Sequence, residues 1–149
     1  MAADHELRPQ FNKLVFPQVA EGKVGLTGYC MGARLAVLAA AMFPERVAAV
    51  AGFHGGPLVT DTADSPHLAV ENISAELYFA HAGDDHHMTP EHIAQFDKAL
   101  SDAGIRYRTE VYEGVRHGYT QADTSDYDPE AAERHYRELL ALFDRTLRR

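Results

Sequence analysis

Short apolar runs alternate with longer segments of helical periodicity along most of the chain. The pattern predicts four strands, at Lys23–Thr27, Val47–Phe53, Leu77–Ala82 and Tyr107–Tyr112. It also predicts three longer helices and a short one, at Met31–Phe43, Pro90–Ala103, Pro129–Leu147 and near Ser65–Glu71. Alternating strands and helices are typical of an α/β domain with a parallel sheet. We therefore expect a single domain over residues 1–149, with about four parallel strands and flanking helices. Residues 1–22 are expected to be irregular or partly helical.

Two helices carry boundary or packing signals. Thr89 is a plausible N-cap for the third predicted helix, with Pro90 at the first helical position, where its missing N–H costs little. In the last helix, apolar residues recur at helical spacing: Tyr136, Leu139, Leu140, Phe143 and Leu147. We interpret this stripe as a buried core face.

The turn between the first strand and the first helix is Gly28-Tyr29-Cys30-Met31-Gly32. A strand, a sharp turn and a helix are the setting of the G-x-S-x-G nucleophile elbow, here with a thiol in place of the hydroxyl. Gly28 and Gly32 would remove Cβ atoms that clash in such a turn. The sulfur would lie at a helix N-terminus, whose N–H groups and dipole favour a thiolate. The pentapeptide alone is equally compatible with a buried structural cysteine.

Chain order strengthens the catalytic interpretation. Asp84 and Asp85 follow the third predicted strand, and His117 follows the fourth. Nucleophile, acid and histidine follow one another in this order in α/β-hydrolases, and the ends of parallel strands are where open α/β sheets place their sites. The sequence predicts a triad of Cys30, Asp85 and His117. Asp84 competes for the acid role, and Asp85 is favoured.

Several segments resemble the dienelactone hydrolases (carboxymethylenebutenolidases). They are Val24–Gly32, Phe53–Gly56, Glu76–Ala82, Met88–Glu91, Val111–Gly114 and His117–Tyr119, within a resemblance that runs from about Gly22 to Leu147. The resemblance implies an α/β-hydrolase fold and hydrolysis of an enol-lactone such as dienelactone, or of a related ester, without metal or coenzyme. It also maps the family's nucleophile to Cys30, its acid to Asp85 and its histidine to His117.

Two positions depart from the family pattern. Ala33 stands where the family usually has a second glycine after the elbow. The family fold has four further strands before the nucleophile strand, whereas about two dozen residues precede that strand here. The expected fold is therefore a truncated α/β-hydrolase fold.

Each residue of the proposed triad has a distinct chemical role. His117 would take the thiol proton and later protonate the leaving alkoxide, while Asp85 would orient the imidazole. The Met31 backbone N–H would be one oxyanion-hole donor. The fold's second donor comes from a loop after an earlier strand, so we expect weak hydrolysis, because loss of one donor costs about 10²–10³ in rate.

Other polar residues near these strand ends have two interpretations each. Arg34 and Arg116 are candidates for binding a substrate carboxylate, or are solvated surface side chains. Tyr29 and Met31 are expected to be pocket walls, and His54 either lines the pocket or is a turn residue. The remaining cluster is His81, His86, His87 and His92. Without a helical i, i+4 pair or cysteine partners, a polar rim is favoured over a metal site.

Composition limits the possible classes of protein. The net charge of −8 and the absence of a Lys/Arg stripe argue against nucleic acid as a partner. No apolar run is long enough for a membrane span, and no signal-peptide pattern opens the chain, so a cytoplasmic protein is expected. The single cysteine excludes an internal disulfide and makes a thiol redox module a weak alternative.

A second hypothesis is a catalytically incomplete half-domain with a role in assembly. In the complete family fold the nucleophile strand is internal, so Lys23–Thr27 would here be an open sheet edge. Either Phe11–Val19 folds over this edge or two chains associate through it. A homodimer is favoured, because Pro17 limits the ability of that segment to pair as a strand.

Overall fold

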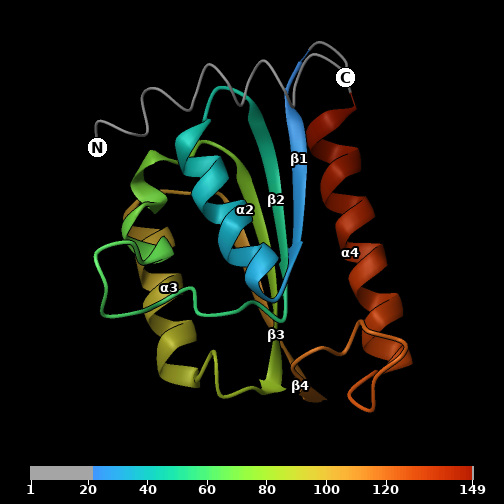
Figure 1. The fold of residues 1–149 in the computed structure, drawn as a ribbon. Helices are drawn as coiled ribbons and strands as arrows, with labels where there is room; N and C mark the ends of the chain where they lie inside the picture. The colour runs from blue at the N-terminus through green and yellow to red at the C-terminus, as the bar shows by residue number, and fades with distance from the viewer. Residues whose placement is uncertain (1–21, 149) are drawn as a thin grey trace.

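A four-stranded parallel sheet forms the centre of the molecule (Figure 1). The computed structural model describes residues 22–148, so the expectations for residues 1–21, including Phe11–Val19, lie outside the described residues. The strands are β1 (Val24–Tyr29), β2 (Val47–Phe53), β3 (Glu76–Asp84) and β4 (Tyr107–Arg116), and they lie side by side in chain order. All three pairings are parallel, which confirms the predicted α/β architecture.

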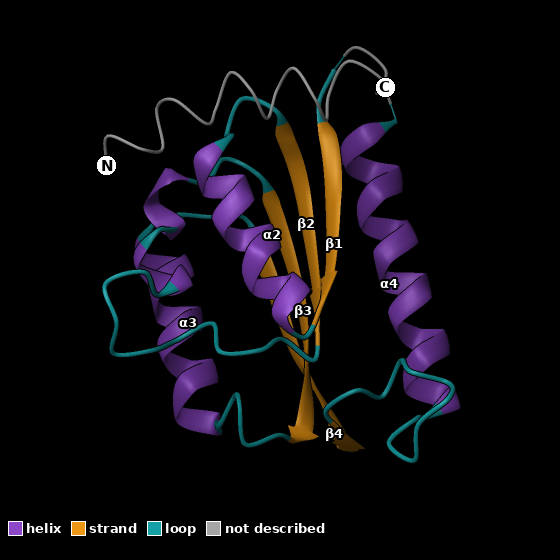
Figure 2. Cartoon of the chain, viewed as in Figure 1, coloured by secondary structure: helices purple, strands orange, loops and turns teal. Residues whose placement is uncertain are grey.

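Helices cover both faces of the sheet (Figure 2). Helices α2 (Met31–Met42) and α3 (Pro90–Asp102) lie on one face, and α4 (Pro129–Leu147) lies on the other. The predicted helix near Ser65–Glu71 is a pair of 3₁₀ turns, η1 (Pro66–Leu68) and η2 (Val70–Asn72). At the start of α3, Thr89 Oγ1 accepts a hydrogen bond from the His92 N–H at 3.3 Å, so the predicted N-cap is confirmed.

Three strands continue past the ends predicted from the apolar runs. Strand β1 reaches Tyr29 because its pairing with β2 continues to Tyr29–Phe53. Strands β3 and β4 extend together until Asp84 pairs with Arg116. Backbone pairing does not require apolar side chains, so the hydrophobic pattern could not predict the polar ends of these strands. The added residues carry the strands to the edge where the candidate site lies.

The core has two layers, one on each side of the sheet. Between the sheet and helices α2 and α3, buried side chains include Val37, Val50, Leu77, Phe79 and Phe96. Between the sheet and α4 they include Phe53, Tyr78, Tyr112, Tyr119 and Leu142. Successive residues of β3 alternate between the layers, as the period of a strand requires.

The apolar stripe predicted for α4 is only partly correct. Leu139 is buried, but Tyr136 and Leu140 are 54% and 64% exposed. The buried face instead includes His135 and Leu142. Each helical residue turns about 100° from the last, so residues directly after His135 and Leu139 point away from the sheet. The helix carries a polar residue, His135, within its packed face.

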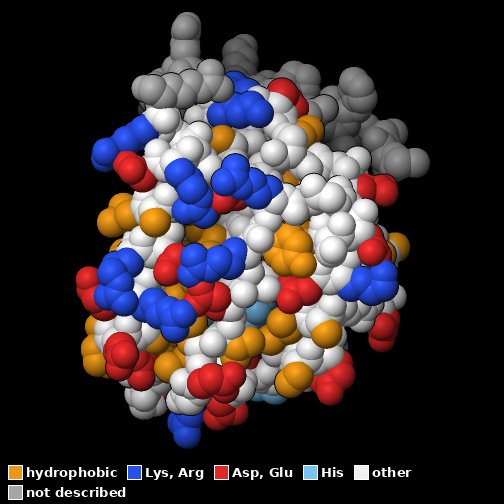
Figure 3. Space-filling model, turned by 180° about the vertical axis from the view of Figure 1, so that it is seen from behind, with side chains coloured by type: hydrophobic (Ala, Val, Ile, Leu, Met, Phe, Trp, Pro, Cys, Tyr) orange, Lys and Arg blue, Asp and Glu red, His pale blue; other side chains and the backbone are white. Residues whose placement is uncertain are grey.

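On the face seen from behind, charged side chains of both signs are interleaved (Figure 3). From behind, Lys and Arg side chains alternate with Asp and Glu side chains rather than forming a patch of one sign (Figure 3). Ion pairs join the sheet to α4, for example Arg145 to Glu76 at 2.7 Å and Arg108 to Glu138 at 3.0 Å. Among the described residues, none of the helices has the length and apolar character required to cross a lipid bilayer.

Candidate active site

Cys30 lies on a sharp turn between β1 and α2. Its backbone has φ 52° and ψ −120°, a left-handed conformation that is strained for a residue with a side chain. A Cβ on Gly28 would lie 2.2 Å from the Gly32 carbonyl oxygen, so that glycine is required by the close approach. The expectation for Gly32 is wrong, because a Cβ added there would meet no described atom within 4 Å other than its chain neighbours and the backbone of its own helix. The turn exposes the thiol at the N-terminus of α2.

Cys30, His117 and Asp85 form a hydrogen-bonded line. Cys30 Sγ lies 3.0 Å from His117 Nε2, and His117 Nδ1 lies 2.7 Å from Asp85 Oδ2. The other carboxylate oxygen, Asp85 Oδ1, accepts the His87 backbone N–H at 2.9 Å. A carboxylate accepts only, so the Nδ1–H of His117 donates to Asp85, and Nε2 faces the thiol.

Strand register brings the acid and the imidazole together. Asp84, the last residue of β3, pairs with Arg116, the last residue of β4, so Asp85 and His117 directly follow a paired position. The register shifts between Ala82 and Asp84, where β4 uses more residues than β3. Glycine permits this irregularity, since Gly114 in β4 has φ 74°.

The two candidate acids have different environments. The side chain of Asp85 is 1% exposed, whereas that of Asp84 is 78% exposed. Asp84 faces Arg116 at 3.7 Å and does not bond to His117 in the structure. Of the two carboxylates, the geometry brings only Asp85 to the imidazole.

An open pocket of about 490 Å³ adjoins the thiol. Its lining includes Cys30, Met31, Arg34, His87 and the loop that follows β2, through Gly56, Pro57, Thr60, Thr62 and Asp64. The Arg34 guanidinium donates to the Pro57 carbonyl at 2.9 Å and to the Asp64 carboxylate at 2.9 Å. Arg34 thus lies at the pocket, as expected for a substrate group, while several of its N–H groups hold the loop.

His54 lies beside the imidazole of His117. The two rings meet edge to face with centroids 5.1 Å apart, and His54 Nε2 lies 2.8 Å from Thr120 Oγ1. Burial, followed by the proximity of His117, lowers the pKa of His54 to about 4. At neutral pH His54 is therefore uncharged and places no positive charge beside the His117 ring.

Two predicted substrate residues lie elsewhere. The Tyr29 ring stacks on Phe53, and its hydroxyl lies 3.0 Å from His135 Nε2, toward α4. The Arg116 guanidinium is largely exposed and faces Asp84 and Asp126. Neither residue is among those that line the pocket at Cys30. Tyr29 is an anchor between the sheet and α4, and Arg116 is a surface side chain in an ion-pair network.

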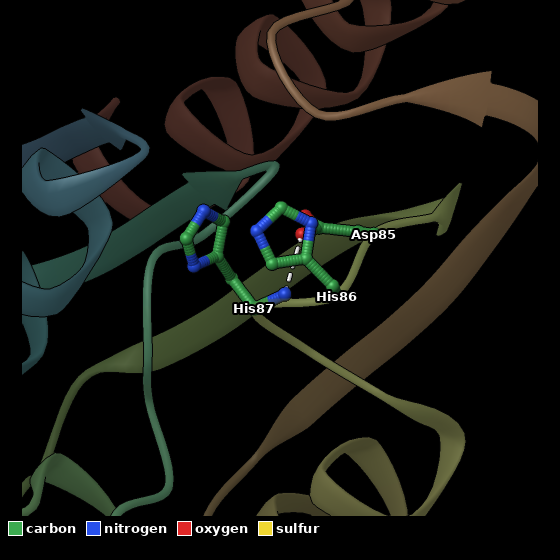
Figure 4. A group of neighbouring side chains, drawn as sticks. All are labelled: Asp85, His86 and His87. Atoms are coloured by element: carbon green, nitrogen blue, oxygen red, sulfur yellow. Dashed lines mark hydrogen bonds between the residues drawn. The ribbon is translucent and has the colours of Figure 1, made fainter.

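The four histidines that were expected to form a polar rim, His81, His86, His87 and His92, do not share one environment. Of the described residues, the group able to converge on a metal ion is Asp85, His86 and His87, whose ligand atoms lie within 4.8 Å of one another (Figure 4). His81 is fully buried beside Phe79. Neither His81 nor His92 belongs to the group, so the cluster is smaller than the sequence suggested.

Sequence reasoning missed Thr120 and His135. Thr120 follows the His117-Gly118 turn by two residues, and no motif marks it as a partner for His54. The sequence did contain an indication that His135 is buried, because it lies one helical turn before Leu139 of the apolar stripe. A polar residue in register with a buried stripe requires a hydrogen-bond partner, and Tyr29 supplies it.

Two curated proteins from Aquifex species are similar in sequence to this chain. The protein of Aquifex aeolicus named "Putative carboxymethylenebutenolidase" is 33% identical over 111 residues, covering 74% of this chain and 46% of that protein. "Protein usf" of Aquifex pyrophilus is 30% identical over 122 residues, covering 81% of this chain and 50% of that protein. The chain thus spans about half the length of the curated relatives it matches.

Solved structures share the fold. The crystal structure of a "Putative Dienelactone Hydrolase" from Klebsiella pneumoniae has a TM-score of 0.80 at 20% identity, covering 94% of this chain and 59% of that chain. A "Dienelactone Hydrolase-like" promiscuous phosphotriesterase from metagenomic libraries has a TM-score of 0.74 at 18% identity, with coverages of 98% and 65%. The model of the dienelactone hydrolase family matches residues 6–147. The chain belongs to the dienelactone hydrolase family.

Proposed function

We propose that the protein hydrolyses a lactone or carboxylic ester through a covalent thioester on Cys30. The observation that carries the proposal is the line of two hydrogen bonds, 3.0 Å from Cys30 to His117 and 2.7 Å from His117 to Asp85. A nucleophile, a base and a buried carboxylate that orients the base are the minimum set for this chemistry.

In the acylation step, His117 Nε2 takes the proton of the Cys30 thiol. The sulfur attacks the ester carbonyl carbon, and the carbonyl oxygen becomes an oxyanion. As the intermediate collapses, the bond from carbon to the alkoxide oxygen breaks, and the His117 imidazolium protonates that oxygen. Asp85 stabilises the imidazolium while it exists.

The Met31 backbone N–H is the proposed oxyanion donor. It is the first N–H of α2, and the first N–H groups of a helix have no partner within the helix. Loss of one oxyanion donor typically costs about 10²–10³ in rate, so this N–H should contribute on that scale. Water then attacks the thioester with His117 as base, which releases the acid and restores the thiol.

The proposed substrate is an enol-lactone of the dienelactone type or a related small ester, with no metal or coenzyme required. Arg34 lies in the pocket lining and offers a positive charge to an anionic substrate. We place the enzyme in the cytoplasm, where a lone thiol such as Cys30 stays reduced.

Hydrolysis of p-nitrophenyl acetate and of a dienelactone tests the proposal. Cys30→Ala should abolish activity, and His117→Ala should reduce it nearly as much, because the residues act as a unit. Asp85→Asn should lower kcat by about 10³–10⁴-fold, because it stabilises the wrong imidazole tautomer. Asp84→Asn is the matched control and should leave kcat within about twofold, because its exposed side chain does not contact the triad.

Direct observation of the intermediate gives an independent readout. Intact-mass measurement after mixing with p-nitrophenyl acetate should detect an acetyl adduct on wild type and none on Cys30→Ala. Equal hydrolysis by wild type and Cys30→Ala, with no adduct, would refute the cysteine mechanism. The chain would then be better described as a non-catalytic module of the family with a role in assembly.

A further inference from the structure

Two histidine side chains stand next to the carboxylate of Asp85 on the loop after β3. The rings of His86 and His87 have centroids 4.1 Å apart, and the side chains lie together beside Asp85 (Figure 4). The ligand atoms of all three residues lie within 4.8 Å of one another. His86 is exposed and His87 is partly exposed, so an ion in solvent can reach the two imidazoles, which lie beside the buried carboxylate of Asp85.

We propose that Asp85, His86 and His87 bind one divalent transition-metal ion, such as Zn²⁺, and that the bound ion switches off the triad. Imidazole nitrogens and a carboxylate oxygen are ligands of zinc, and three protein ligands with an open position form a common zinc arrangement. Hard cations such as Mg²⁺ prefer oxygen ligands and do not suit a site with two imidazoles.

The geometry requires only a small closure. Zinc holds nitrogen and oxygen ligands at about 2.0–2.2 Å, so ligand atoms now within 4.8 Å of one another must move closer. Side-chain rotation supplies this movement, because the imidazole of His86 is exposed. Both oxygens of Asp85 already accept one hydrogen bond each, from His87 N–H and His117 Nδ1–H. Each oxygen has a second lone pair, so the carboxylate can also bind a metal.

A metal ion bound at this site would affect catalysis through Asp85, a consequence that rests on the proposed function. A metal ion that shares the carboxylate withdraws the negative charge that stabilises the His117 imidazolium. His87 also lines the pocket at Cys30, and its ring lies 5.0 Å from that of His117. Metal ligation would fix the His87 ring at the pocket. The bound ion is therefore an inhibitor that leaves the thiol itself unoccupied.

Calorimetric titration with zinc chloride tests binding without any assay of activity. Wild type and Cys30→Ala should each bind one Zn²⁺ with the same affinity. His86→Ala should bind about tenfold or more weakly, since loss of even an outer partner of a metal ligand costs 10–100-fold in affinity. His67→Ala is the matched control, because His67 bonds to Ser65 on a different loop, and it should bind as wild type. Magnesium chloride should give no heat of binding to this site.

Alternative outcomes overturn the proposal. Unchanged zinc affinity in His86→Ala refutes the site, and loss of binding in Cys30→Ala places the ion on the thiol instead. With binding established, zinc should inhibit ester hydrolysis by wild type at about tenfold lower concentration than it inhibits His86→Ala. Equal sensitivity of the two proteins would refute the inhibitory role. A protein that binds zinc but has no esterase activity would refute the proposed function and leave the metal site standing.

Discussion

Acid should destabilise this protein through His81, a histidine buried in the sheet. Its side chain is 1% exposed, and neither ring nitrogen has a hydrogen-bond partner among the described residues. Burial lowers the pKa of His81 from its ordinary 6.5 to about 4. In the unfolded chain the imidazole titrates near 6.5, so the unfolded state takes up the proton first as the pH falls. The contribution of His81 to the free energy of unfolding is therefore fully present above about pH 6.5, decreases as the pH drops, and levels off below about pH 4.

The magnitude follows from the two pKa values. A shift from 6.5 to about 4 makes the free energy of unfolding fall by about 2 kcal/mol between pH 7 and pH 5. His54, whose pKa is also lowered to about 4, should add a similar amount. About 2 kcal/mol corresponds to roughly 4–8 °C in Tm for a domain of this size.

Urea denaturation at pH 7 and pH 5 measures the effect. His81→Phe replaces the ring with one that cannot be protonated and can still stack on Phe79, so it should lose about 2 kcal/mol less than wild type between the two pH values. His67→Gln is the control and should lose as much as wild type. Equal loss of stability in His81→Phe and wild type would show that protonation of His81 does not cause the loss. Should His81→Phe not fold, NMR of wild type decides, because the His81 ring signals should not titrate between pH 7 and pH 5.

Three further predictions test other parts of the molecule. Gly28→Ala should destabilise the protein by about 2 kcal/mol, because its Cβ would meet backbone at 2.2 Å. Gly32→Ala has open space for its Cβ and should be neutral or stabilising by up to about 1 kcal/mol. Thermal unfolding of both variants tests this, and equal Tm values would contradict it. Tyr29→Phe should lower the free energy of unfolding by about 1–3 kcal/mol and leave kcat unchanged, because it leaves His135 Nε2 buried without its partner. A fall in kcat without a fall in stability would indicate that Tyr29 is a pocket residue after all. The homodimer stays a prediction: light scattering at micromolar concentration should give twice the monomer mass. Deletion of the residues before Ala20 should leave that mass ratio unchanged, and a monomer in both proteins would contradict the prediction.

Much of the site was predictable because its residues follow apolar strands in sequence. Cys30, Asp85 and His117 each come directly after a strand, and parallel strands carry their ends to one edge of the sheet. The choice between Asp84 and Asp85 depended on where β3 ends. Hydrophobic pattern does not determine that point, because the last residues of β3 pair through backbone.

Other features were not predictable because they depend on contacts between distant segments. The sequence places Arg34 near the elbow, but its bonds to Pro57 and Asp64 depend on the path of the loop after β2. Tyr29 was expected at the pocket, yet strand alternation turns its ring toward α4. The partner of Tyr29 is more than one hundred residues later in the chain, so neither local pattern nor motif could supply it.

The irregular pairing of β3 with β4 makes the number of residues in each strand decisive for the geometry of the proposed triad. Leu77 and Tyr107 are partners near the start of the two strands, yet Asp85 stands eight positions after Leu77 and His117 ten positions after Tyr107. The bulge around Gly114 absorbs the difference. Deleting a single residue from it would draw His117 back by about 3.3 Å and turn its side chain toward the opposite face, although every residue of the proposed triad would still be present. Insertions and deletions in β4 should therefore be far more damaging to activity than substitutions at the same exposed positions.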